Sequence, residues 1–98
     1  MATYRLSAKA KNDLRKIAAY TLRVLGQQQT ITYIADLRSY CSEITLNPAL
    51  DRGCDYLAPG LLRSERNKHV IFYRRDSTGI RVSRILHQSM LPERHPLD

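Results

Sequence analysis

The chain has 98 residues, enough for a single domain over residues 1–98 with a thin hydrophobic core. Hydrophobic residues make up 43% of it, which excludes a disordered protein, and no stretch approaches the roughly 20 apolar residues of a membrane span. Sixteen Lys and Arg against nine Asp and Glu give a net charge of +7, which attracts nucleic acid, acidic proteins or anionic membranes. With no long apolar run at the N-terminus to form a secretory signal, a cytoplasmic protein without membrane contact is expected.

The N-terminal half predicts a strand and two helices. "TYRLS" alternates and is rich in β-formers, which predicts a strand over residues 3–6. Ser7 can cap a helix over residues 8–25, where apolar residues recur at helical spacing, and Gly26 can end it. A second helix is predicted from Gln27 to Thr45 or Leu46. Because only Gly26 separates them, the two helices should form an antiparallel hairpin over about 8–46.

The C-terminal half predicts a sheet. After the turn-rich residues 47–60, strands are predicted at 61–65, 68–75 and 80–87, with "DSTG" as the turn between the last two. The sheet therefore covers about 61–87, and residues 88–98, which contain two prolines, should form an irregular tail. The order β-α-α-β-β-β predicts an α+β fold in which the helical hairpin packs on one face of a small, mostly antiparallel sheet.

Alternation along the last strand separates two faces. The face predicted to meet the core carries Ile80, Val82, Arg84 and Leu86. The face predicted to meet solvent or a partner carries Arg81, Ser83, Ile85 and His87. Arg84 interrupts the apolar set, and three explanations stay open: it reaches out at an edge, pairs with an acid, or marks a bulge.

The predicted sheet carries most of the positive charge. Residues 61–87 contain seven basic residues against Glu65 and Asp76, a net charge of +5. Arginine occurs twelve times and lysine four times, and arginine binds carboxylate and phosphate with two parallel hydrogen bonds. The surface is therefore either a set of specific anion contacts or an ordinary solvated face.

His87, at the end of the last strand, is the one candidate acid–base group. Cleavage of RNA by a ribose 2′-hydroxyl needs an acid, a base and cations, and His87 with Arg66, Arg81 and Arg84 is a possible set. The simpler alternative is a histidine hydrogen-bonded at a sheet edge. Cys41, Cys54 and the histidines lack the spacing of a metal site or a disulfide framework, so neither a metal nor a cofactor is expected.

Three segments resemble the ParE toxins of bacterial type II toxin–antitoxin systems. They are "DLRKIAAYT" in the first helix, "NPALDRG" after the second, and "HVIFYRRDSTGIRVSRILHQSM" with the "LPERH" that follows it. The resemblance implies the fold of the RelE/ParE superfamily and a toxin that traps DNA gyrase on cleaved DNA, which blocks replication. It also implies neutralisation by an acidic ParD-like antitoxin in a hetero-oligomeric complex, through which alone the toxin meets DNA.

The sister RelE branch consists of ribosome-dependent mRNA endonucleases, which makes that activity the alternative. His87 falls near a catalytic position of that branch. However, Gln88 stands where several of its nucleases have tyrosine, and residues 47–60 contain no lysine. These departures favour a non-catalytic ParE toxin over an enzyme.

The surfaces expected from this reading are a target surface and an antitoxin groove. The target surface is predicted to include Arg63, Arg66, Arg74, Arg75, Arg81, Arg84 and Arg94. The antitoxin should cover an apolar groove beside the hairpin and the sheet, with contacts from Tyr20, Tyr33, Tyr40 and Arg75. A third reading, a nucleic-acid-binding module, lacks a recognition helix, because the basic residues of the first helix show no base-reading pattern.

Overall fold

The computed structural model describes residues 3–97, and its elements confirm the predicted order. Strand β1 (Thr3–Leu6) leads into α1 (Ala8–Leu25) and α2 (Gln27–Leu46), and β3 (Leu62–Arg66), β4 (His69–Asp76) and β5 (Gly79–His87) follow. Each predicted strand lies within one residue of its observed bounds. Three short elements were not predicted: the 3-10 helices Pro48–Leu50 and Pro92–Arg94, and the two-residue strand β2 (Arg52–Gly53).

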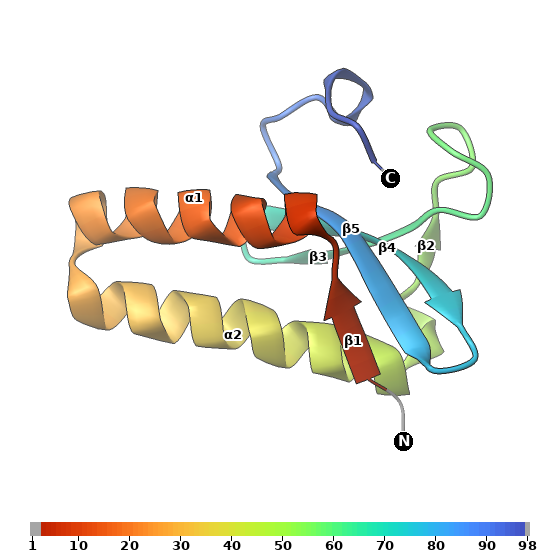
Figure 1. Cartoon of the computed structure of the whole chain (residues 1–98), viewed down its shortest axis with the longest axis horizontal. Coiled ribbons are helices and arrows are strands. Elements are labelled where there is room, and N and C mark those ends of the chain that lie inside the picture. Colours follow the sequence, from red (N-terminus) through yellow and green to blue (C-terminus); the bar gives the residue numbers. More distant parts are fainter. Residues whose placement is uncertain (1–2, 98) are drawn as a thin grey trace.

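The five strands form one sheet in the order β1-β5-β4-β3-β2, and the two helices run antiparallel beside it (Figure 1). Only the β1–β5 pair is parallel, whereas the other three pairs are antiparallel. The observed architecture confirms the predicted α+β class and the mostly antiparallel sheet.

The helical hairpin is set by a cap and a glycine. The Ser7 hydroxyl accepts a hydrogen bond from the Ala10 amide at 3.0 Å, which satisfies one of the amides left unpaired at the start of α1. Gly26, with φ of 87°, ends α1 and begins α2. A side chain would be strained at this φ, so glycine permits the sharp reversal.

Gly79 makes a second close approach possible, between β1 and β5. Its φ is 145°, and a Cβ atom at this position would overlap the backbone of Thr3. Thr3 is the register partner of Gly79 and donates its amide to the Thr78 carbonyl at 2.9 Å. The missing side chain therefore lets the first strand join the sheet edge.

Both faces of the sheet are covered. The larger cluster lies between helices and sheet and includes Leu37, Ile44, Ile71, Tyr73 and Ile80. A smaller cluster on the other face joins the loop after β2 to the tail and includes Cys54, Leu61, Phe72, Leu86 and Leu97. The tail predicted as irregular thus contains a 3-10 helix and packs on the sheet through Leu97, while Asp98 lies outside the described residues.

The face assignment along β5 is wrong beyond Val82, because the strand contains a bulge. Phe72 pairs with Arg84 and Tyr73 pairs with Val82, so Ser83 is an extra residue. The extra residue reverses the alternation that follows it. Ser83 and Ile85, expected to be open, are therefore buried at 1% and 2% exposure.

Candidate functional site

A hollow of about 580 Å³ lies between the helical hairpin and the ends of β4 and β5. We call it the hairpin groove. Its lining includes Ile17, Tyr20, Val24, Tyr33, His69 and His87. Its position beside the hairpin and the sheet matches the description of the expected antitoxin groove, and its occupation by an antitoxin stays a prediction.

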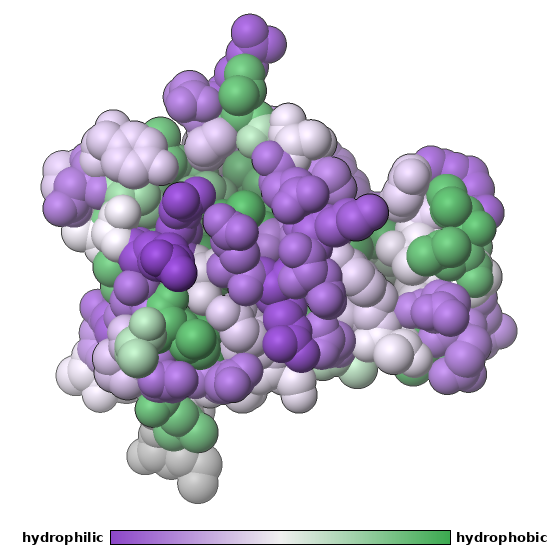
Figure 2. All heavy atoms as spheres, turned by 180° about the vertical axis from the view of Figure 1, so that it is seen from behind, coloured by the Kyte–Doolittle hydropathy of each residue, from purple (hydrophilic) through white to green (hydrophobic). Residues whose placement is uncertain are grey.

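The rim of the hairpin groove is unusually apolar for a surface. Tyr20, Val24 and Leu25 are 59%, 54% and 62% exposed, although all three belong to α1. Figure 2 shows apolar side chains gathered at the end of the helical hairpin, whereas hydrophilic ones cover the middle of the same view. Exposed apolar residues gathered at one place on a small protein are typical of a protein-binding surface.

Three titratable rings line the groove next to one another. The Tyr33 hydroxyl lies 2.5 Å from His69 Nδ1, and the His69 and His87 rings meet edge to face with centroids 5.4 Å apart. Burial, helped by the nearby His87, lowers the pKa of His69 to about 4, so His69 is neutral at pH 7. The Ser89 amide donates to His87 Nδ1 at 3.1 Å, which leaves Nε2 as the atom of His87 available to a partner.

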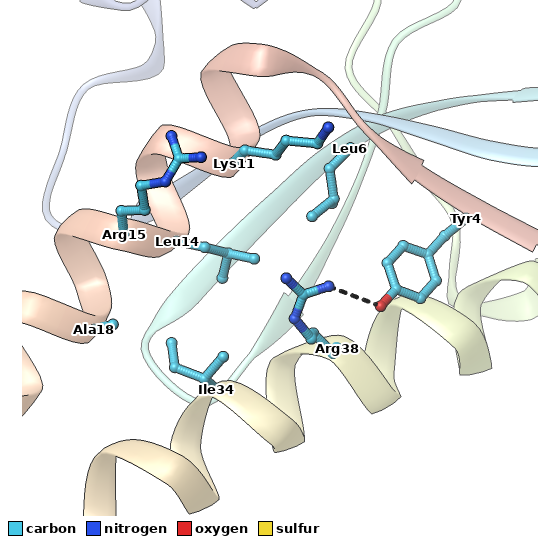
Figure 3. Close-up of a pocket in the computed structure, with 8 residues that line it drawn as sticks. All are labelled: Tyr4, Leu6, Lys11, Leu14, Arg15, Ala18, Ile34 and Arg38. Atoms are coloured by element: carbon cyan, nitrogen blue, oxygen red, sulfur yellow. Dashed lines mark hydrogen bonds between the residues drawn. The ribbon is translucent and has the colours of Figure 1, made fainter. Parts of the chain in front are cut away.

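A second hollow, of about 550 Å³, opens between α1, α2 and β1 (Figure 3). Leu14 and Ile34 point into it from the two helices. Arg38 reaches across from α2 and donates a hydrogen bond to the Tyr4 hydroxyl at 3.3 Å. With Lys11 also lining it, this hollow is a second place where an apolar floor meets positive charge.

Arg84, predicted for the target surface, is instead a buried structural residue with 9% exposure. Its Nε and Nη2 donate to the Asp13 carboxylate at 2.8 and 2.9 Å, and Nη1 donates to the Pro96 carbonyl at 3.0 Å. Two of the three explanations for Arg84 therefore hold: it lies at a bulge and it pairs with an acid. Its placement on an open surface is corrected.

The set proposed for RNA cleavage does not come together. Arg66 Nε and Nη2 are held by the Asp36 carboxylate at 3.0 and 2.8 Å, and Arg84 is held by Asp13. Arg81 lies six residues from His87 along β5, roughly 20 Å away at the rise of a strand. The prediction that these side chains share one site is therefore wrong.

Tyr40 and Arg75 lie outside the hairpin groove, which corrects their placement there. Tyr40 is 7% exposed, and its hydroxyl lies 2.5 Å from Ser64 Oγ. Arg75 donates to the Asp51 carboxylate and, through Nη2, to the Ile44 carbonyl at 2.5 Å. Arg75 thus satisfies the carboxyl end of α2, and Asp51, from the "NPALDRG" segment, holds it there.

The other predicted arginines are on open or half-open surface. Arg63 and Arg74 are half-buried and Arg81 is exposed, and all three lie on the face of the sheet turned away from the helices. Arg94 is exposed on the 3-10 helix of the tail. Tyr20 and Tyr33 do line the groove in which they were predicted.

Sequence reasoning missed His69, which lies directly opposite His87 in the β4–β5 ladder. The tight turn "DSTG" could have revealed this pairing. A two-residue turn fixes the register of a hairpin, so residues at equal distances before and after the turn face each other. Counting outward from Asp76 and Gly79 would have brought His69 close to His87.

Within residues 3–97, no three or more His, Cys, Asp or Glu side chains are grouped so that they could hold a metal ion. In the same part of the chain, no helix combines the length and apolar character that crossing a membrane needs.

Known proteins resemble this chain over nearly its whole length. The family model described as the ParE toxin of type II toxin-antitoxin system, parDE, matches residues 4–92. Toxin ParE1 of Caulobacter vibrioides is 36% identical over 97 residues, which cover 97% of this chain and 98% of that protein. Toxin ParE1 of Mycobacterium tuberculosis H37Rv is 33% identical over 93 residues, covering 94% and 95%. The solved structure described as the chromosomal ParDE TA system from P. aeruginosa shares the fold with a TM-score of 0.73 at 19% identity, covering 89% of this chain and 96% of its own.

Proposed function

The chain belongs to the ParE toxin family of type II toxin–antitoxin systems, and we propose that it inhibits DNA gyrase and so blocks replication. A ParD-like antitoxin neutralises it in a hetero-oligomeric complex in the cytoplasm. The observation that supports neutralisation by an acidic antitoxin is the hairpin groove, an apolar surface on a protein of net charge +7. Two features favour a protein-binding toxin over an enzyme. The chain belongs to the ParE family, and Arg66 and Arg84, which a nuclease would need around His87, are held by carboxylates.

The chemistry of the hairpin groove specifies the segment that fills it. Tyr20 and Val24 offer apolar contact area, and Lys16 and Lys68 stand at the lining. A segment with apolar side chains on one face and carboxylates beside them meets both features. An antitoxin segment of this kind would fold on binding, because alone it has no surface on which to bury its apolar side.

The groove is tested with Tyr20→Ala, because Tyr20 is exposed and its loss removes contact area without disturbing the core. We expect binding of the antitoxin encoded beside the toxin to weaken by roughly tenfold or more, as for an aromatic residue central to an interface. Tyr56→Ala is the matched control, because Tyr56 is 73% exposed in the loop after β2, outside the groove. Equal affinities of the two variants, measured by titration calorimetry, would place the antitoxin elsewhere.

The target is tested with purified, antitoxin-free toxin, gyrase, supercoiled plasmid and ATP. Gyrase-dependent linear DNA that appears after protein denaturation is the expected result. Tyr20→Ala should still produce it, and added antitoxin should suppress it less well for this variant than for the native chain. Normal supercoiling without linear DNA would exclude gyrase as the target.

The alternative, a ribosome-dependent mRNA endonuclease, draws on one observation, the contacts of His69 with His87 on one side and with Tyr33 on the other inside the groove. It requires that His87→Ala abolish toxicity while antitoxin affinity persists. The gyrase proposal requires that His87→Ala remain toxic. Growth of cells producing the variant, with primer extension on mRNA from those cells, separates the two.

A further inference from the structure

Every strand of the sheet contributes one exposed or half-buried arginine to the face turned away from the helices. We call the five side chains the arginine row; they are Arg5, Arg81, Arg74, Arg63 and Arg52, in the order of the strands β1-β5-β4-β3-β2. The neighbours of Arg5 and Arg81 in the chain, Tyr4 and Val82, belong to the core under the helices, so the two arginines point to the other face.

The register brings like charges directly opposite one another. Arg5 pairs with Arg81, Arg81 pairs with Arg74, and Arg63 pairs with Arg52. Arg63 is opposite Phe72, which places it diagonally next to Arg74 and continues the row. Like charges facing each other across strands destabilise a sheet, so the fold itself gains nothing from this arrangement.

Carboxylates compensate only part of this charge. Asp76 forms an ion pair with Arg5, and Glu65 lies 3.8 Å from Arg63. Arg74 donates a hydrogen bond to the Pro59 carbonyl, which orders the side chain. Arg52, at one end of the row, and Arg81, next to Arg5 near the other end, are exposed. A row that costs stability and keeps a net positive charge is suited to an external polyanion.

We propose that the arginine row binds the phosphate backbone of duplex DNA without reading its sequence. Five neighbouring strands span roughly 19 Å, since strands lie about 4.8 Å apart, and duplex DNA carries about one charge per 1.7 Å of its axis. The backbone therefore places phosphates within reach of the exposed Arg52 and Arg81, whose forked donors match phosphate oxygens.

The same face disfavours single-stranded nucleic acid, which is bound by stacking bases on exposed aromatic rings. Phe72, opposite Arg63, is 2% exposed, so the strands of this face offer no ring to a base, and the exposed Tyr56 lies in the loop after β2. Within residues 3–97, both α-helices lie on the opposite face, and the tail brings only the three-residue 3-10 helix Pro92–Arg94 to this one. The described chain therefore offers no recognition helix here, which leaves backbone contact as the mode of binding. In this proposal the toxin itself contacts DNA, whereas the sequence predicted that it meets DNA only through the antitoxin complex. The proposal does not depend on whether gyrase is the target of the toxin.

The experiment measures binding of the purified full-length chain to a fluorescent mixed-sequence 24-base-pair duplex by anisotropy, from 50 to 200 mM KCl. The variants are R81Q, R52Q and R52Q/R81Q, since both arginines are exposed. The controls are R23Q and K9Q/R23Q, which remove the same charge from exposed positions on α1. A thermal melt of each variant confirms that it is folded.

We expect the native chain to bind with an affinity that falls steeply with salt. Each row substitution should weaken binding roughly tenfold at 0.1 M salt and flatten the slope of log affinity against log salt by about 1, the contribution of one phosphate contact. The controls should change affinity less than twofold. Equal losses in row and control variants would mean diffuse attraction by net charge and would overturn the proposal. The absence of duplex binding would also overturn it. A third contrary result would be that Arg52 and Arg81 bind a polyglutamate chain and do not bind DNA.

Discussion

At the scale of single residues, Asp13 joins three distant parts of the chain. It accepts both Arg84 donors and the Ile85 amide, the latter at 3.0 Å, while Arg84 also holds the Pro96 carbonyl of the tail. Asp13 and Arg84 are 71 positions apart, and they lie in two of the segments through which the chain resembles ParE toxins. In this chain the two segments are joined by a structural ion pair that fastens α1 to β5.

Asp13→Ala should lower the free energy of unfolding by about 3 kcal/mol, because it leaves the buried Arg84 guanidinium without its counter-charge. Urea denaturation followed by circular dichroism measures this loss. Arg84→Ala should cost a similar amount, and the double variant should cost less than the two single losses added together. A loss below 1 kcal/mol for Asp13→Ala would show that the pair does not hold the fold.

His69 should make stability depend on pH. Its pKa is about 4 in the folded protein, mainly because of burial, against an ordinary value of 6.5 in the unfolded chain. Between these values the unfolded chain binds the proton and the fold does not. The free energy of unfolding is therefore greatest above pH 6.5 and should fall by up to about 3 kcal/mol as the pH drops to 4.

His69→Gln is the comparison for this pH dependence, since it removes the titrating group but keeps a polar side chain near Tyr33. Chemical denaturation at several pH values between 4 and 7 should give a flatter profile for the variant than for the native chain. Identical profiles would mean that His69 is protonated in the fold as readily as in the unfolded chain.

At the scale of elements, the helices and strands follow local patterns, whereas the faces of β5 do not. Helical spacing, the Ser7 cap and Gly26 are each readable within a few residues, and all three are as predicted. The bulge at Ser83 arises from the pairing of β5 with β4, and the alternation of residues along β5 alone cannot predict it. It decided which side chains of β5 reach the core and placed Arg84 beside Asp13.

The like-charge register of the sheet predicts that one substitution stabilises the protein. Arg81 stands between Arg5 and Arg74, so Arg81→Gln removes two repulsive cross-strand contacts. The free energy of unfolding should rise by about 0.5 kcal/mol, seen as a higher melting temperature at low salt, and the gain should shrink as salt screens the charges. Arg15→Gln, on the exposed surface of α1, should leave the melting temperature nearly unchanged. A lower melting temperature for Arg81→Gln would mean that Arg81 makes a stabilising contact.

At the scale of the whole molecule, the tail closes a second core. Leu97 is 9% exposed against the cluster that includes Cys54, Leu61 and Leu86, and Arg84 holds the neighbouring Pro96 carbonyl. Leu97→Ala should therefore lower the free energy of unfolding by about 2 kcal/mol. Amide exchange in residues 88–97 should also become faster, which mass spectrometry detects. Unchanged exchange would show that Arg84 alone anchors the tail.

The sequence by itself determined the elements, their order, the family and the basic character of the sheet, because these depend on neighbours in the chain and on composition. Tyr20 and Tyr33 lie off the predicted buried stripes of their helices and line the hairpin groove, and their contact with an antitoxin stays a prediction. Only the tertiary structure decided which charges are available. Arg84, Arg75 and Arg66 are each held by a carboxylate at least 24 residues away, and the aligned row through Arg81 exists only in the register of the assembled sheet. Ion pairs and registers join residues far apart in the chain, and a local pattern contains no information about such partners.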